Sequence, residues 1–551
     1  MRSDNGKDSF TTLQSLIPGM TTESYNQLKL SLDIKTSLLM NKYCFYTKEI
    51  AICAIFLFLL CIFANSVPGP HHDEAWILLR AQEIADGLRP LSGMTFYTGA
   101  LHQYLVWPLF ELFGYKLEVL RISSAIFNTL ALFFAMLVVR QLHPRQGYQV
   151  EVGLLLCTFP AFITFSRFSI EITALNPLLL FAGLFFLVKA TQSGSTRQVI
   201  LANVSGLCFA LAAYNHLVAI VFPLALGFSA LIIFRKECLY NRTTWLAVIS
   251  FLIYFSPRLI RIIYHLSGPT ESEQTSSGEL IKDFLNLPQF LAGIWDGNLI
   301  YQRYVGENLL WVAPYTTFAM IALLVGCIIC KRTKLSHFEQ TVIAFLCLLL
   351  LFTLIISPGL SLRYFEMPVL LIPYLIVRFA ARLREQRGQW TRKFGNWILI
   401  GLLSLNCFYL TVNYYFNFVR TGGTISVFPL GHRFIETSSH FVQVDKLYHQ
   451  LVERGVKRVI GQDFIVVPLK IYDIEKQALK LESLEPDKLL PSDRAAIDKL
   501  TSVVYYNGVI VTPWGDSLLD FRDRKSIKSG SIEYRLDPSF DSHFLVFKAV
   551  F

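Results

Sequence analysis

The chain has 551 residues, of which 53% are hydrophobic and 16% are charged. Because an ordinary soluble domain has about 25% charged residues, this composition excludes a disordered chain and a purely soluble globular protein. It favours a multi-pass membrane protein with some soluble mass attached. The net charge is +10, yet residues 421–551 carry 17 basic and 17 acidic residues. The basic surplus therefore lies among the hydrophobic segments, where it indicates cytoplasmic loops, and we expect no nucleic acid among the partners.

Eleven hydrophobic segments are predicted to cross a membrane, given that a spanning helix needs roughly 20 apolar residues. The long run 198–234 contains two of them because it is broken at Tyr214-Asn215-His216. The short segment 367–377 is extended through Arg378, whose long side chain is able to snorkel to the surface. The predicted spans are residues 50–70, 122–139, 152–166, 172–188, two within 198–234, 243–257, 308–330, 340–362, 367–378 and 394–419.

Basic residues are distributed unequally between the loops on the two sides of these spans. The short loops on one side hold 16 Lys and Arg residues, and those on the other side hold two. Since cytoplasmic loops are enriched in Lys and Arg, the first set is predicted to be cytoplasmic. The tail 1–45 is then expected to be cytoplasmic and loosely ordered. The predicted membrane domain covers residues 46–420. Because the number of predicted spans is odd, residues 421–551 are expected outside the cytoplasm.

Two of the predicted outer loops are long, at residues 67–120 and 263–307. The first contains two apolar stretches, Ala75–Gly87 and Leu101–Phe113, which we predict to be helices lying on the membrane surface. After residue 420 one helix and several strands are predicted, at residues 444–455 for the helix and 457–461, 464–471, 503–511, 532–536 and 544–550 for the strands. The expected fold class is an α-helical polytopic membrane protein with a C-terminal extracytoplasmic α/β domain of about 130 residues.

Charged side chains gather at four places on the predicted outer surface. These are Asp73 with Glu74, Arg167 with Glu171, Arg258 with Arg261, and Arg363 with Tyr364. Carboxylates activate a hydroxyl nucleophile or hold a divalent cation, and arginines neutralise a phosphate leaving group. The combination fits a phosphorylated lipid whose head group lies in the interface. Taken singly, each group has the simpler interpretation of an interface anchor at a helix end.

Several separated motifs occur along the chain in a fixed order. They are Asp73-Glu74, Gly87-Leu88-Arg89-Pro90, Tyr97-Thr98-Gly99, the run Pro108–Gly114, Leu120-Arg121-Ile122-Ser123, Arg167 with Glu171, and Arg363-Tyr364 with Pro368. In this order they resemble the GT-C glycosyltransferases over roughly residues 50–380. That family includes the protein O-mannosyltransferases and the aminoarabinose transferases that modify lipid A. The stretch Tyr97–His102 lacks the Lys-Pro-Pro tripeptide of many aminoarabinose transferases, which argues against lipid A as the specific acceptor.

The resemblance implies an integral membrane glycosyltransferase, in a bacterial inner membrane, that moves a sugar from a polyprenyl-phosphate donor to an extracytoplasmic acceptor with inversion at the anomeric carbon. The acceptor class stays open between a glycan, a lipid and a protein. The resemblance makes Asp73 the general base, Glu74 a metal ligand or an orienting neighbour, and Glu171 a ligand of metal or acceptor. Some relatives use a divalent metal (Mg²⁺ or Mn²⁺), which these three carboxylates would hold. The residues expected to bind the donor phosphate are Arg363, Tyr364, Arg258, Arg261 and Arg167.

The alternative from another functional class is a transporter or flippase of lipid-linked sugars. Such a protein is expected to carry charges near the middle of the membrane, between broken helices. The predicted spans are largely free of charge, which favours the enzyme. A third interpretation, a receptor or structural protein that works through its outer domain, leaves the charges around Asp73 unexplained.

Overall fold

The computed structural model describes most of the chain from residue 46 onward. Outside the described part lie residues 1–45, 66–69, 94, 96, 145, 236–239, 267–276, 296–324, 326–334, 357–361, 386–388, 417–443, 462, 484–500, 507–508, 512–517, 521–524, 541–543 and 551. The chain divides into two compact units, Met1–Ile52 and Cys53–Phe551. The described residues of the first unit begin helix α3 (Thr47–Cys61), and the residues of the candidate site all belong to the second unit.

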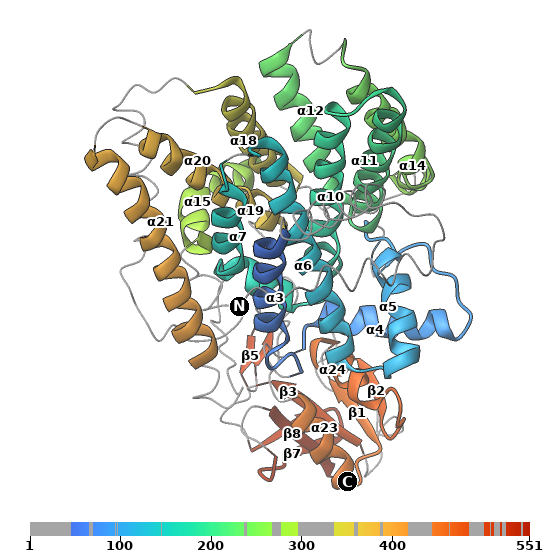
Figure 1. Cartoon of the computed structure of the whole chain (residues 1–551). Coiled ribbons are helices and arrows are strands. Elements are labelled where there is room, and N and C mark those ends of the chain that lie inside the picture. The colour runs from blue at the N-terminus through green and yellow to red at the C-terminus, as the bar shows by residue number, and fades with distance from the viewer. Residues whose placement is uncertain are drawn as a thin grey trace, which may run out of the picture. The chain divides into compact units, whose positions relative to one another are not determined.

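Helices make up nearly all of the described chain up to residue 416. They are α4 (His72–Ala85), α5 (Leu101–Phe113), α6 (Leu117–Leu142), α7 (Tyr148–Cys157), α8 (Pro160–Arg167), α9 (Glu171–Ala174), α10 (Asn176–Thr191), α11 (Ser195–Asn215), η2 (Leu217–Ile220), α12 (Val221–Phe234), α14 (Arg242–Leu266), α15 (Ser277–Trp295), α18 (His337–Ile356), η4 (Leu362–Phe365), α19 (Glu366–Leu370), α20 (Ile372–Glu385), α21 (Gln389–Tyr409) and η5 (Leu410–Phe416). Helices α6, α10, α11 and α14 pack successively against one another (Figure 1).

Eight helices among the described residues are long and apolar enough to cross a membrane, and a bent pair makes a ninth. The sequence predicts eleven spans. The predicted span 308–330 lies almost entirely outside the described residues. Helix α3, in the first predicted span, has 15 residues, fewer than a complete span needs. The expectation of an α-helical polytopic membrane protein is confirmed, and the exact number of spans stays a prediction.

The bent pair interrupts the predicted span 152–166. Helices α7 and α8 meet at 61°, and α8 begins with Pro160 in its first turn. Proline lacks a backbone N–H and is favoured where a helix starts, so it ends one helix and begins the next. Residues 168–170 then lead into the short helix α9, which places Ser169 and Glu171 in the interior of the protein.

The first outer loop folds into α4 and α5, which confirms the two helices predicted there. They pack together through buried side chains such as Leu78 on α4 and Phe110 on α5. The same apolar cluster includes Val467 and Ile471 from helix α24 (Asp463–Asp473), so α24 covers one side of α4. The location of α4 and α5 at a membrane surface stays a prediction.

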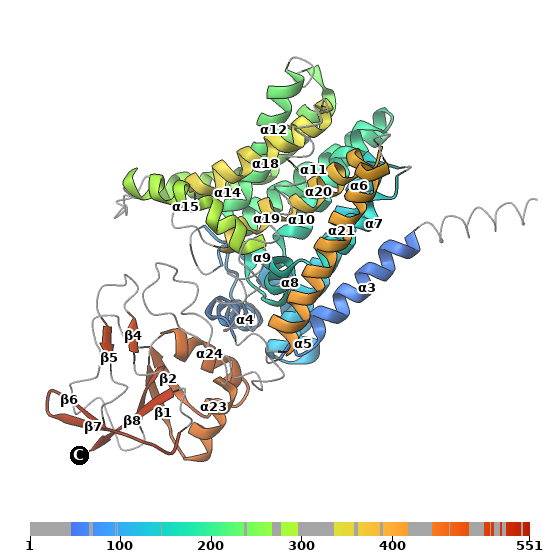
Figure 2. The same cartoon turned by 90° about the vertical axis from the view of Figure 1, so that its left-hand side faces the viewer.

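The last part of the described chain has mixed helices and strands. Its further elements are α23 (Val444–Glu453), β1 (Arg458–Gly461), β2 (Lys480–Ser483), β3 (Thr501–Tyr506), β4 (Val509–Val511), β5 (Leu518–Asp520), β6 (Ser526–Ser529), β7 (Ile532–Leu536) and β8 (Phe544–Val550). Six strands form a sheet in the order β2-β1-β3-β8-β7-β6, in which β1 pairs in parallel with β2 and β3 while the other pairs are antiparallel. Figure 2 shows α23 and α24 beside this sheet, where they share an apolar core with β1 and β8. The predicted domain boundary at 420 lies outside the described residues.

The segment 464–471 is a helix, although its apolar run predicts a strand. The run is almost entirely apolar because helix α24 is buried on two sides. Ile465 and Leu469 face the core of the sheet, whereas Val467 and Ile471 face α4. A helix that is covered on both sides has an unbroken apolar sequence, which periodicity alone does not distinguish from a buried strand.

Candidate active site

Helix α4 carries Asp73 and Glu74 in its first turn, and a capping box determines where the helix begins. His71 is the N-cap residue: its Nδ1 accepts a hydrogen bond from the Asp73 backbone N–H at 2.9 Å, and its own N–H donates to Glu74 Oε2 at 2.8 Å. This reciprocal arrangement satisfies two backbone N–H groups at the start of the helix. Successive helical residues point roughly 100° apart, so the two neighbouring carboxylates face different surroundings.

Glu74 points into the protein and pairs with Arg121 of α6. Arg121 Nε donates to Glu74 Oε1 at 2.9 Å and Arg121 Nη2 donates to Oε2 at 2.7 Å. The backbone N–H of Ser169 donates to Oε1 at 3.0 Å, and both charged side chains are at most 1% exposed. Together with the cap of α4, these bonds give each Glu74 oxygen two donors. Of the two roles expected for Glu74, the orienting neighbour fits this geometry and the metal ligand does not.

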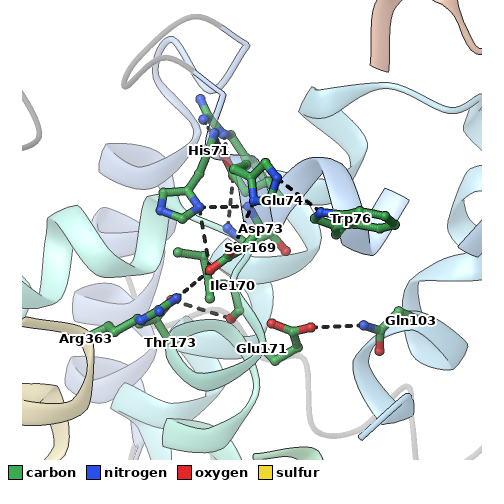
Figure 3. A network of polar contacts seen from close by, with 12 residues as sticks. His71, Asp73, Glu74, Trp76, Gln103, Ser169, Ile170, Glu171, Thr173 and Arg363 are labelled. Atoms are coloured by element: carbon green, nitrogen blue, oxygen red, sulfur yellow. Dashed lines mark hydrogen bonds and ion pairs between the residues drawn. The ribbon is translucent and has the colours of Figure 1, made fainter. Parts of the chain in front are cut away.

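Asp73 points the other way and pairs with Arg363, as Figure 3 shows. Arg363 Nη1 donates to Asp73 Oδ2 and so joins the first outer loop to η4, 290 residues later. The Asp73 side chain is 9% exposed and that of Arg363 is 24% exposed, so solvent reaches the guanidinium. The Arg363 Cζ atom lies 5.3 Å from the centroid of the Tyr364 ring, within the range of a cation–π contact.

The surroundings of Asp73 favour its ionised form. Burial works against ionisation, but the neighbouring imidazole of His71 and the guanidinium of Arg363 outweigh it and hold the pKa of Asp73 well below its usual range. Burial lowers the pKa of His71 to about 4, although the Asp73 charge opposes that shift. A neutral His71 agrees with its Nδ1 accepting the cap hydrogen bond. At neutral pH the site therefore contains a carboxylate in contact with an arginine.

Glu171 is the first residue of α9, and both its side chain and its backbone carbonyl accept hydrogen bonds. Its residue exposure is 3%. Gln103 Nε2 of α5 donates to Glu171 Oε1 at 3.1 Å, and Asn215 Nδ2, at the end of α11, donates to the Glu171 backbone carbonyl at 2.8 Å. Ser169, two residues earlier, is held by Glu74. The third predicted carboxylate, Glu171, is thus connected by hydrogen bonds to the predicted first outer loop.

A backbone connection fixes the first outer loop to the end of α11. The Gly99 N–H donates to the Asn215 carbonyl at 2.9 Å, and an isolated antiparallel bridge joins Thr98 to His216. A Cβ at position 99 would clash with the backbone carbonyl of Tyr214, so this close approach requires glycine. Arg258 Nη2 donates to the Thr98 carbonyl at 3.0 Å, which places this arginine on the same connection.

The other two arginines expected at the donor phosphate are placed differently. Arg261 is exposed, and its Nη2 lies 3.4 Å from Ser92 Oγ in the first outer loop. Arg167 is buried, and its guanidinium donates to the backbone carbonyls of Leu59 at 3.0 Å and Ile62 at 2.5 Å. Arg167 therefore anchors the end of α8 to the first predicted span, a structural role that differs from phosphate binding.

Aromatic rings adjoin the Asp73–Arg363 pair. The His216 ring centroid lies 5.5 Å from that of Tyr97 and 5.5 Å from that of Tyr364. Burial and, next, the charge of Arg363 lower the pKa of His216 to about 3. The imidazole is therefore neutral at pH 7, and the two tyrosines are partly exposed. His216 thus contacts both tyrosines, and the Tyr364 ring lies beside the Arg363 guanidinium.

No sequence pattern marks Gln103 and Asn215 as site residues, and Arg121 is marked only as part of a motif. All three are buried polar side chains that hold the predicted carboxylates. A sequence signal existed for Arg121, because an arginine inside an apolar segment requires an acidic partner. No comparable signal marks a single amide side chain.

The expected metal site does not fit the geometry of these residues. Both Glu74 oxygens are already occupied by donors. Asp73 is in contact with Arg363, whose positive charge disfavours a neighbouring cation. Within the described ranges, no group of three or more His, Cys, Asp or Glu side chains is arranged to hold a metal ion. We therefore derive no step through a metal.

Known proteins resemble this chain in part of its sequence and in its fold. Residues 99–260 match the family model described as dolichyl-phosphate-mannose-protein mannosyltransferase, while curated protein sequences gave no match. The crystal structure of ArnT from Cupriavidus metallidurans in the apo state is similar with a TM-score of 0.53 and 14% identity, over 90% of this chain and 97% of that one. The same protein bound to undecaprenyl phosphate gives 0.51 and 14%, over 91% and 97%.

An oligosaccharyltransferase from Archaeoglobus fulgidus, tethered with an acceptor peptide, is similar with a TM-score of 0.50 and 10% identity, over 92% of this chain and 74% of that one. At such identities the likeness concerns the fold. Together, the match of residues 99–260 to the dolichyl-phosphate-mannose-protein mannosyltransferase model and the fold shared with ArnT confirm the resemblance expected from the motifs.

Proposed function

We propose that this protein is an integral membrane glycosyltransferase that moves one sugar from a polyprenyl-phosphate donor to an extracytoplasmic acceptor, with inversion at the anomeric carbon. The observation that carries the proposal is the contact between Asp73 and Arg363. It brings a carboxylate and an arginine together at one end of the membrane helices, in a chain with the GT-C fold. A base and a phosphate-binding cation are the two groups that such a transfer requires.

In this proposal Arg363 binds the donor phosphate and Asp73 accepts the proton of the acceptor. The acceptor oxygen or nitrogen attacks the anomeric carbon on the side opposite the phosphate. The bond from that carbon to the phosphate oxygen breaks, and polyprenyl phosphate leaves with the electron pair. The donor phosphate competes with Asp73 for the Arg363 guanidinium. Because Arg363, together with His71, keeps the pKa of Asp73 low, weakening the contact with Arg363 makes the carboxylate a stronger base.

The other residues have supporting roles in the proposal. Glu74 and Arg121 fix the helix start that carries Asp73, and Tyr364 lies beside the guanidinium that binds phosphate. Arg258 donates a hydrogen bond to the Thr98 carbonyl. In this way it helps to fix the predicted first outer loop, and this role requires no contact with the donor. The Glu171 side chain binds the acceptor in this proposal.

Purified protein incubated with a panel of substrates tests the proposal. The donors are undecaprenyl-phosphate-linked mannose, glucose and aminoarabinose, and the acceptors are a Ser/Thr peptide, a lipid A and an oligosaccharide. We expect at least one pair to give glycosylated acceptor with equimolar release of undecaprenyl phosphate. Release from no pair by a protein that is folded would contradict the proposal.

The orientation of the chain is a separate expectation, which follows from the 16 basic residues on one side against two on the other. A reporter fused after residue 390 should be active only in the cytoplasm, and one fused after residue 425 only outside it. This order puts the tail 1–45 inside and residues 421–551 outside. The reverse result at either position would place Asp73 and Arg363 on the wrong side for an extracytoplasmic acceptor.

Replacing Arg363 tests its contact with the donor. Arg363→Lys keeps the positive charge but loses the planar fork that contacts two phosphate oxygens at once. We expect about a tenfold rise in the KM for the donor, and a larger rise for Arg363→Ala. Arg384→Lys is the matched control, because Arg384 makes a two-bond contact with Glu151 at the other end of the candidate membrane span Arg363–Glu385. Unchanged donor KM in both Arg363 variants would make Arg363 only an interface anchor.

A further inference from the structure

Gln103 occupies a buried position from which its side chain contacts Glu171. It lies in the first turn of α5 and is 1% exposed. Its Nε2 donates to Glu171 Oε1 at 3.1 Å, a contact between residues 68 positions apart (Figure 3). The orientation of the amide is determined by its partner, because a carbonyl oxygen turned toward a carboxylate would repel it.

The other end of the Gln103 side chain has no such partner. Its Oε1 is buried and accepts no hydrogen bond. In the described part of the chain, the contact with Glu171 is therefore the one hydrogen bond that this side chain makes. Burying an amide with one end unsatisfied costs stability. An apolar side chain of the same length would fill the space without that cost, so packing does not explain the glutamine.

Glu171 differs from Asp73 and Glu74 because it forms no ion pair with an arginine among the described residues. Glu74 has Arg121 and Asp73 has Arg363, whereas among the described residues no ion pair involves Glu171. Its partners are neutral amides, from Gln103 on the side chain and from Asn215 on the backbone. Burial and, next, the charge of Asp73 raise the pKa of Glu171 to about 7. A buried carboxyl group whose partners are neutral amides remains able to bond an O–H or N–H group of a bound molecule.

We propose that Gln103 is a positioning residue that aims the Glu171 carboxylate at an O–H or N–H group of the acceptor. The inference rests on the proposed function and identifies what selects the acceptor in that site. A carboxylate repels the donor phosphate and attracts a hydroxyl or amine, so Glu171 serves the acceptor side while Arg363 serves the donor side. Gln103 acts through Glu171 and has no direct part in bond formation.

The test compares variants in the assay described above, with the donor and acceptor pair that gives product. Gln103→Met keeps the length of the side chain and removes the donor. We expect its kcat/KM for the acceptor to fall by about ten- to a hundredfold, the effect of losing a hydrogen bond to a charged group. The KM for the donor and the binding of undecaprenyl phosphate alone should stay unchanged. Gln198→Met, which removes an amide between α11 and α14, is the matched control.

A double-mutant cycle with Glu171→Gln separates positioning from packing. If Gln103 acts through Glu171, Gln103→Met should have little further effect on acceptor kcat/KM in the Glu171→Gln background. An equal loss in both backgrounds, a loss that falls on donor KM, or normal acceptor kcat/KM in Gln103→Met would each overturn the inference. Absence of any transfer by the folded wild-type protein would instead overturn the proposed function, and with it the assignment to an acceptor.

Discussion

Asp73→Asn is expected to lower turnover by at least about a hundredfold, because a positioned general base typically contributes 10²–10⁴-fold to such a reaction. Asparagine keeps the size of the side chain and an oxygen for Arg363, but it does not accept the acceptor's proton. The variant should therefore fold and bind undecaprenyl phosphate normally. Turnover is measured as release of undecaprenyl phosphate at saturating concentrations of both substrates.

Two further variants complete that experiment. Asp86→Asn makes the same chemical change at the exposed C-cap of the same helix, and it should leave turnover unchanged. Glu171→Gln should impair use of the acceptor. If Asp73→Asn turns over normally while Glu171→Gln is inactive, the base is Glu171. Normal turnover in both would contradict the assignment of a base to this site.

Arg121→Met is expected to be the most destabilising substitution near the site. It leaves the Glu74 carboxylate buried without its cation, and removing one partner of a buried ion pair costs about 3–5 kcal/mol. Both partners are at most 1% exposed, so water does not replace the lost contact. The measurement is the temperature at which the detergent-solubilised protein loses its monodisperse elution profile.

Arg80→Met is the matched control for that substitution. Arg80 pairs with Glu83 on the same helix, where the two side chains are 30% and 34% exposed, and such pairs contribute about 0–1 kcal/mol. The Arg121→Met variant should also recover part of its stability when Glu74 becomes leucine, because the uncompensated charge is then removed. Equal stability of Arg121→Met and Arg80→Met would show that the Glu74–Arg121 pair does not hold the site together.

The features that were predictable from the sequence are those with a local signal. Apolar length revealed most of the membrane helices, and the limits of α5 at Leu101–Phe113 coincide with the predicted stretch. The rule for basic loops put Asp73 and Arg363 on one side of the membrane, and the structure brings them into contact.

The features that were not predictable depend on which face each helix turns toward its neighbours. Asp73 and Glu74 are neighbours of the same chemical type, and only the packing of α4 decides which one faces Arg121. The contact of Gln103 with Glu171 bridges 68 residues between two helices. Hydropathy identifies a helix and its length, but the partner of one buried polar side chain depends on the arrangement of the helices around it.

The contact of α24 with α4 has a consequence for the order in which the chain is made. Ala75 and Leu78 leave the ribosome early, whereas Val467 and Ile471, which cover them, are synthesised much later. Roughly 390 residues separate the two segments, so translation at about 5–20 residues per second leaves one side of α4 uncovered for about 20–80 seconds. During that interval the nascent helix α4 exposes apolar surface, and the helix that carries Asp73 gains these buried contacts only after α24 has been synthesised.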